Sequence, residues 1–255
     1  MTKFIRPSPM KAGYGIWRKY FADAQVILLT GSVIRGEGTP ASDLDIVVIQ
    51  KKLSAAYRLS FVYEGWPVEA FVHDPQTLNY FCWELDRRSG IPTLPSMVIE
   101  GKPIPRENKV SRSLKLLAQE VLAAGPPKWT ETDIARARYT ITNLCDDIRA
   151  PRNHAELIAS ANSLYDVLAD FYFRAAGRWS AKGKSVPRKL AEADSVLARR
   201  FIRAFQVASS THRTSLLLQL AKVILKPYGG WLFDGYRVDA PSKWRKPFRK
   251  RHVTR

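Results

Sequence analysis

Cysteine is scarce in this chain: Cys82 and Cys145 are the only two among 255 residues, and their spacing is not that of a metal-ligand motif. A disulfide framework is therefore not expected. No apolar run reaches the length of a membrane span, and the first residues contain no apolar segment of signal-peptide length. We expect a protein of the reducing cytoplasm, without a membrane segment, in which both thiols are partly buried.

Acidic residues are few in the second part of the chain. Residues 1–108 contain 13 Lys or Arg and 11 Asp or Glu, whereas residues 109–255 contain 28 and 12. Most of the formal net charge of +18 therefore lies after residue 108. Such an excess indicates an anionic partner, although ordinary surface charge is the alternative. Residues 243–255 hold seven of these cations and no acid, which predicts a solvated basic tail.

The hydrophobic pattern changes near Asn108. Before it, short apolar segments of strand length alternate with helical segments, and a tight turn at 64–67 predicts a hairpin. After it, only helical patterns follow. We therefore predict an α/β (α+β) fold with a small mixed-sheet domain at 1–108, an all-helical bundle at 109–242 and the basic tail at 243–255.

Individual elements follow from the same patterns. Strands are predicted over 25–30, 44–50, 57–64 and 67–73, and a short edge strand with a turn over 97–104. Helices are predicted over 14–24, 75–88, 110–124, 132–150, 154–176, 195–209 and 213–228.

A glycine-containing turn and two aspartates frame one predicted strand. Gly31-Ser32 follows the strand at 25–30, and we expect it to open a short helix whose free N–H groups suit a phosphate. Asp43 and Asp45 are two residues apart at the start of the next strand. Side chains alternate along a strand, so the two carboxylates share a face and can together bind a hard cation such as Mg²⁺.

Glu69 is the third acid of this set. In the strand at 67–73 it shares a face with Phe71, while the other face is apolar. A lone carboxylate in such a strand is costly to bury without a partner. An exposed position on an edge strand is one explanation, and a place beside the two aspartates is the other. The second would complete a cluster of three carboxylates.

This arrangement resembles the nucleotidyltransferase superfamily of the DNA polymerase β type, in its minimal and kanamycin-nucleotidyltransferase-like members. The matching positions are Gly31-Ser32, Arg35-Gly36, the Ser42-Asp43-Leu44-Asp45 motif, and Glu69. The stretch at 171–190 is also similar to a tryptophan-containing basic segment in the helical domain of the kanamycin-type enzymes.

The resemblance implies transfer of a nucleotidyl group by two metal ions, Mg²⁺ or Mn²⁺, with ATP or another nucleoside triphosphate as donor. Asp43, Asp45 and Glu69 would be the catalytic, metal-binding residues. The nucleotide would be bound by Gly31, Ser32, Arg35, Ser42 and Lys184.

Further residues are candidates by the same resemblance. Lys182, Arg188 and Lys189 could also contact the phosphates, and Asp146 or Asp147 could act as general base. An exposed, solvated helix face is the alternative explanation for each of them.

The motifs do not identify the acceptor substrate of the transfer. The cationic second part would repel a polycationic aminoglycoside, so an anionic acceptor such as RNA, or a protein hydroxyl, is favoured. Two further classes remain possible: an antitoxin-type interaction protein, and an RNA-binding protein that keeps the fold without chemistry. The three acids argue against both inert classes, because a protein without metal would be more stable without charges that repel one another.

Overall fold

The computed structural model describes residues 6–245, which form two compact units. Unit 1 comprises residues up to Trp129 together with 169–193, and unit 2 comprises residues 130–168 and those from Asp194 onward. The division differs from the expected boundary near Asn108. Residues 109–129 and 169–193 belong with the sheet, although both segments were expected in the helical bundle. Of the expected basic tail, residues 246–255 lie outside the described range.

Unit 1 is built on a five-stranded mixed sheet with the order β3-β4-β2-β1-β5. The strands are β1 (Val26–Thr30), β2 (Leu44–Ile49), β3 (Tyr57–Tyr63), β4 (Trp66–His73) and β5 (Lys102–Ile104). Strands β2 and β4 are parallel, and the other pairs are antiparallel. The first four strands confirm the predicted ones to within one or two residues.

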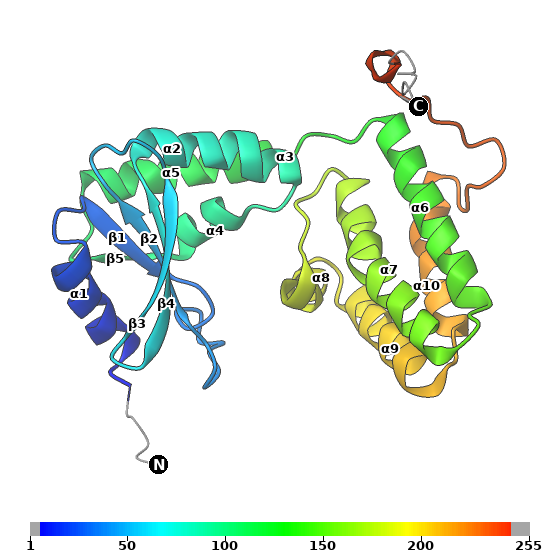
Figure 1. Cartoon of the computed structure of the whole chain (residues 1–255), viewed down its shortest axis with the longest axis horizontal. Coiled ribbons are helices and arrows are strands. Elements are labelled where there is room, and N and C mark those ends of the chain that lie inside the picture. Colours follow the sequence, from blue (N-terminus) through cyan, green and yellow to red (C-terminus); the bar gives the residue numbers. More distant parts are fainter. Residues whose placement is uncertain (1–5, 246–255) are drawn as a thin grey trace, which may run out of the picture. The chain divides into compact units, whose positions relative to one another are not determined.

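Helices cover both faces of this sheet (Figure 1). On one side α1 (Pro9–Tyr20) packs Ala12 and Ile16 against alternate residues of β1, β2 and β4. On the other side lie α2 (Pro75–Tyr80), the π-helix η1 (Phe81–Asp86), α4 (Thr93–Glu100) and α5 (Lys109–Ala124). The strands β1 and β2 are therefore almost fully buried.

Local capping explains where several of these helices begin and end. Asp74, Asn108 and Thr130 each begin a helix and accept a hydrogen bond from the backbone three residues ahead. The side chain of that third residue accepts from the backbone of the cap in return, which completes a capping box. Gly90 ends the helical run that starts at Pro75 by adopting a positive φ of 78°. The helix predicted over 75–88 is therefore confirmed as one continuous helical run.

Three local expectations are corrected. The short edge strand predicted within 97–104 is present as β5 at the sheet edge, but residues 97–100 are the end of α4, because Val98 belongs to a helical face that packs on α5. The first helix lies at Pro9–Tyr20 rather than 14–24, since Ser8 caps it and Pro9 starts it. Residues 33–35 form a tight turn and not a short helix.

Unit 1 also receives a segment from the helical half of the sequence. It contains the end of α7 (His154–Arg174), the short η2 (Gly183–Ser185) and α8 (Val186–Ala193), which was not predicted. Arg174 donates to the carbonyl of Pro127, Trp179 donates to that of Leu122, and the Ser180 backbone donates to Gly90. These bonds attach residues 169–193 to the loop and helices beside the sheet.

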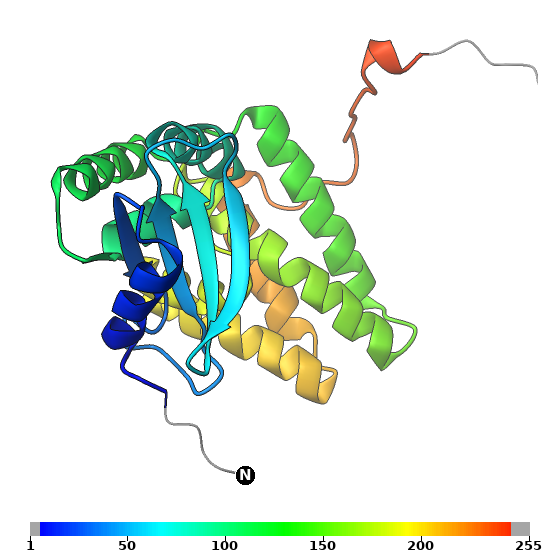
Figure 2. The same ribbon diagram turned by 60° about the vertical axis from the view of Figure 1, so that its left-hand side comes forward.

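Unit 2 is all-helical. It consists of α6 (Glu131–Arg149), the first part of α7, α9 (Ser195–Thr211) and α10 (Ser215–Leu225), which pack side by side (Figure 2). Tyr165 of α7 meets Phe201 and Phe205 of α9 edge-on, at the centre of this packing. Among residues 6–245, no helix combines the length and the apolar character that crossing a bilayer requires.

Candidate active site

Asp45 on β2 and Glu69 on β4 are direct neighbours across parallel strands. The register pairs Leu44 with Val68 and Asp45 with Glu69. Leu44 and Val68 point into the core beneath α1, so the two acids point to the opposite face. Glu69 therefore lies on the same side of the sheet as Asp45.

Asp43 completes a cluster of three half-buried carboxylates. It precedes β2 by one residue, and one oxygen each of Asp43, Asp45 and Glu69 lie within 4.8 Å of one another. Oxygen atoms at this spacing can share a cation, since Mg²⁺ and Mn²⁺ prefer carboxylate ligands. The convergence of acids expected from the sequence is present in the fold.

The charges in this cluster oppose one another. Burial, and then the neighbouring carboxylates of Asp43 and Glu69, raise the pKa of Asp45 from 3.8 to about 6, while Lys184 and Arg35 act in the other direction. A bound cation would relieve this repulsion. The donor set and its electrostatics thus both fit a divalent metal ion.

The Gly31 turn lies directly against the cluster. Gly31 has a φ of 83°, and its carbonyl accepts hydrogen bonds from the backbones of Ile34 and Arg35 in a tight turn. A Cβ atom at Gly31 would collide with the carboxylate of Asp45. Glycine is therefore required twice, for the backbone conformation and for the close approach of this carboxylate.

Comparison with known proteins agrees with this geometry. Residues 15–83, which include the turn and all three acids, match the model of the nucleotidyltransferase domain family. The chain therefore contains a nucleotidyltransferase domain, which spans residues 15–83. No curated protein matches it. One similar solved structure is a nucleotidyltransferase-like protein from Exiguobacterium sibiricum, with 15% identity, a TM-score of 0.43 and coverage of 85% of this chain and 74% of that chain.

Lys184 of η2 reaches the nucleotidyltransferase site from the helical half of the sequence. Its ammonium group is close enough to lower the pKa of Asp45, and η2 belongs to unit 1. The nearby α8 is tied to the same region, because Arg188 donates to Glu37 at 2.7 Å. Two of the four cations named from the basic stretch therefore lie around the turn and the acids.

Arg35 is held in an ion-pair network beside the turn. Its guanidinium donates to Glu37 at 2.9 Å and to Glu100 at 2.7 Å, and Glu37 also accepts from Arg188. The network links the loop after Gly31 to α4 and α8. Arg35 is thus both near Asp45 and already paired with two carboxylates.

Arg58 of β3 is a site neighbour that the sequence did not indicate. Its guanidinium forms an ion pair with the Glu69 carboxylate and lies 4.9 Å from the centre of the Phe71 ring. The β3–β4 register brings it there by pairing Arg58 with Phe71. A single arginine on a predicted hairpin carries no signal of its own, and only the strand pairing shows which acid it meets.

The remaining candidates have other contacts. The Ser42 hydroxyl accepts from the Thr39 backbone at 2.8 Å and so shapes the loop before Asp43. Lys189 pairs with Glu192 on its own helix. Asp146 pairs with Arg149 on α6, within unit 2, as a solvated helix face would. Asp147 lies on the same helix as Asp146, next to it in the sequence.

Proposed function

We propose that this nucleotidyltransferase is metal-dependent and moves a nucleoside monophosphate from a nucleoside triphosphate to a hydroxyl acceptor. The observation that supports it is the convergence of Asp43, Asp45 and Glu69 beside a glycine turn. Such a cluster has no structural benefit in a protein that binds no cation, because burying like charges together destabilises the fold.

We assign metal binding to the three acids, and phosphate binding to the turn and to Lys184. Asp43 and Asp45 would hold two ions, Mg²⁺ or Mn²⁺, and Glu69 would hold one of them. Bound ions of this kind supply charge neutralisation at the triphosphate and an activated acceptor hydroxyl. The turn at Gly31 and Ser32 presents backbone and hydroxyl groups to the phosphates, and Lys184 adds a positive charge from η2.

Arg35 and Ser42 are proposed as supporting nucleotide-binding residues. Arg35 lies beside the turn, and its positive charge lowers the pKa of Asp45. Ser42 keeps the loop closed through its bond to the Thr39 backbone, which sets the position of Asp43. Both residues therefore act on the geometry of the site as well as on the substrate.

The proposed acceptor is anionic or a protein. The surplus of positive charge after residue 108 opposes an aminoglycoside and favours RNA or an acidic protein surface. We place the reaction in the cytoplasm, where both free cysteines, which are buried, would remain reduced.

Transfer of label from nucleotides tests the proposal. Purified protein is incubated with each α-phosphate-labelled nucleoside triphosphate, Mg²⁺ or Mn²⁺ and a cell extract, and labelled products are identified. We expect metal-dependent labelling that Asp45→Asn abolishes and that Asp146→Asn leaves intact. Equal labelling by Asp45→Asn, or labelling that persists in a chelator, would overturn the assignment.

A further inference from the structure

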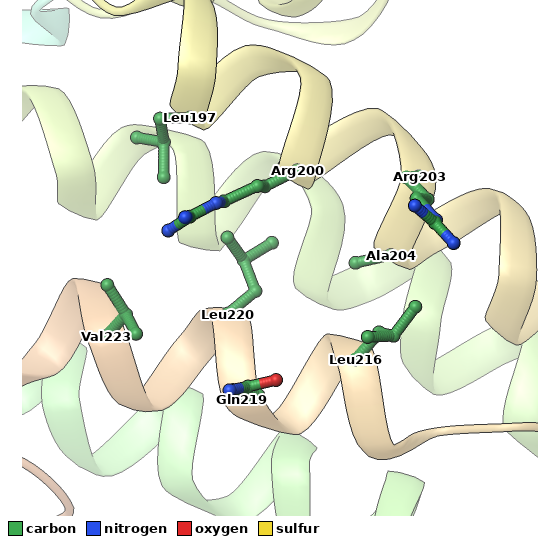
Figure 3. Close-up of a pocket in the computed structure, with 8 residues that line it drawn as sticks. All are labelled: Leu197, Arg200, Arg203, Ala204, Leu216, Gln219, Leu220 and Val223. Atoms are coloured by element: carbon green, nitrogen blue, oxygen red, sulfur yellow. The ribbon is translucent and has the colours of Figure 1, made fainter.

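A groove runs between α9 and α10 in unit 2 (Figure 3). It has a volume of about 380 Å³ and is separate from the acids of unit 1. Its lining residues are Leu197, Arg200, Arg203 and Ala204 from α9, and Leu216, Gln219, Leu220 and Val223 from α10.

The spacing of the lining residues is helical on both sides. On α10 they follow the i, i+3, i+4, i+7 pattern from Leu216 to Val223, and on α9 they follow the i, i+3, i+6, i+7 pattern from Leu197 to Ala204. Leu216 and Val223 remain 37% and 49% exposed. Two such rows side by side form the surface on which the apolar face of a third helix packs.

The groove is also cationic. Residues 195–225 contain five Lys or Arg and no Asp or Glu. Arg200 and Arg203 lie one turn apart on the α9 side, as Figure 3 shows, and neither forms an ion pair with any carboxylate of residues 6–245. Unpaired guanidinium groups beside an apolar row select a partner that carries carboxylates next to its own apolar residues.

The net charge of this chain and the side chains that line the groove argue against two other occupants, a second copy of the chain and a single-stranded nucleic acid. A second copy of this chain would bring a further net charge of +18, which opposes association. A single-stranded nucleic acid would stack its bases on aromatic side chains, but the eight lining residues include none. The aliphatic row with flanking arginines fits a polypeptide better.

We propose that the groove between α9 and α10 binds an acidic amphipathic helix of a partner protein. Leucine-type side chains of the partner would fill the space between Leu216, Leu220 and Val223, and its Asp or Glu residues would pair with Arg200 and Arg203. The interaction requires no nucleotide or metal ion, so it is tested independently of the transfer reaction.

The test is a selection from a displayed peptide library on the full-length protein. Each peptide has a fixed row of leucines at helical spacing and random residues at the flanking positions. Peptides that also bind a Val223→Glu variant are removed by counter-selection. We expect enrichment of Asp and Glu at the flanks. The synthesised peptides should bind the Arg200→Glu, Arg203→Glu double variant at least tenfold more weakly.

Arg199→Glu is the matched control, because Arg199 is on the same helix but does not line this groove. It should change peptide affinity less than threefold. Three results would overturn the proposal. The selected peptides could carry neutral or basic flanks, the Arg199→Glu control could weaken peptide binding as much as the double variant does, or no peptide could bind the wild type better than it binds Val223→Glu. Self-association or oligonucleotide binding that the double variant abolishes would also overturn it, since the occupant would then be of another kind.

Discussion

Asp45 and Glu69 occupy opposite positions on two parallel strands, so that two carboxylates separated by 24 positions in the sequence face the same space. Parallel strands are joined by a crossover, here the β3 strand and its flanking turns. Two of the three acids are therefore positioned by the central strands of the sheet, and the chemistry of the site depends on how the repulsion between the acids is balanced.

The first prediction concerns pH and stability without metal. The folded pKa of Asp45 is about 6 and its ordinary value is 3.8, so the folded state binds the proton more tightly. The stability of the wild type should then decrease as pH rises from about 4 to 6. Asp45→Asn removes this penalty and should stabilise the metal-free protein by about 1–2 kcal/mol at pH 8, since partial solvation reduces the full effect.

The measurement is urea unfolding of both proteins in chelator between pH 4 and pH 8. The gain from Asp45→Asn should shrink toward pH 4, because the carboxyl group is then protonated in the folded state and partly protonated in the unfolded state, so that little free energy is needed to protonate it on folding. A gain that is independent of pH would mean that charge repulsion is not its cause.

The second prediction concerns the turn. Gly31→Ala should displace the Asp45 carboxylate and reduce Mn²⁺ affinity at least tenfold, because the new Cβ and that carboxylate cannot occupy the same space. Gly36→Ala is the control: Gly36 has a similar φ of 78° but no atom within 4 Å of its Cβ position. It should lose about 1 kcal/mol of stability through backbone strain and keep its metal affinity. Equal loss of Mn²⁺ binding in both variants would show that strain alone is responsible.

The sequence predicted the three acids of the site but not the arginine beside them. Asp43 and Asp45 are local in sequence, so their shared face follows from strand alternation alone. Glu69 could be added because an acid among apolar strand residues requires a partner. Arg58 could not, since its contact with Glu69 depends on the register of β3 on β4. A short helix was predicted at 33–35 because Gly31-Ser32 follows a strand; the backbones of Ile34 and Arg35 do donate to Gly31 as at a helix start, but no helix follows.

The helical part shows a different limit. Amphipathic periodicity predicted α5, α6, α7, α9 and α10 closely, because each helix has one apolar face. Periodicity does not tell which unit a helix joins. Helix α5 packs on the sheet and residues 169–193 return to it, through contacts between residues far apart in the chain.

The third prediction concerns Arg58. Its guanidinium neutralises Glu69 when no metal is present and therefore competes with a cation for that carboxylate. Arg58→Ala should raise the affinity for Mn²⁺ alone by about threefold to tenfold, as measured by electron paramagnetic resonance titration. Arg88→Ala, which removes an arginine paired with Glu84 elsewhere, is the control and should have no effect. Weaker Mn²⁺ binding by Arg58→Ala would contradict the competing role.

The fourth prediction separates nucleotide binding from metal binding. Lys184→Ala should weaken binding of a non-hydrolysable nucleoside triphosphate about tenfold, because one positive charge near the phosphates is lost. Its affinity for Mn²⁺ alone should be unchanged or higher, since a cation that repels the metal is removed. Lys189→Ala is the control, because Lys189 pairs with Glu192 on its own helix. Unchanged nucleotide affinity in Lys184→Ala would remove this residue from the site.

The most direct measurement is the number and affinity of Mn²⁺ ions bound by the wild type and by Asp45→Asn in the presence of a non-hydrolysable nucleoside triphosphate. The central claim predicts two ions for the wild type, and at least a tenfold loss of affinity in a variant that remains folded. Binding that is equal in the two proteins, or absent from both, would contradict it.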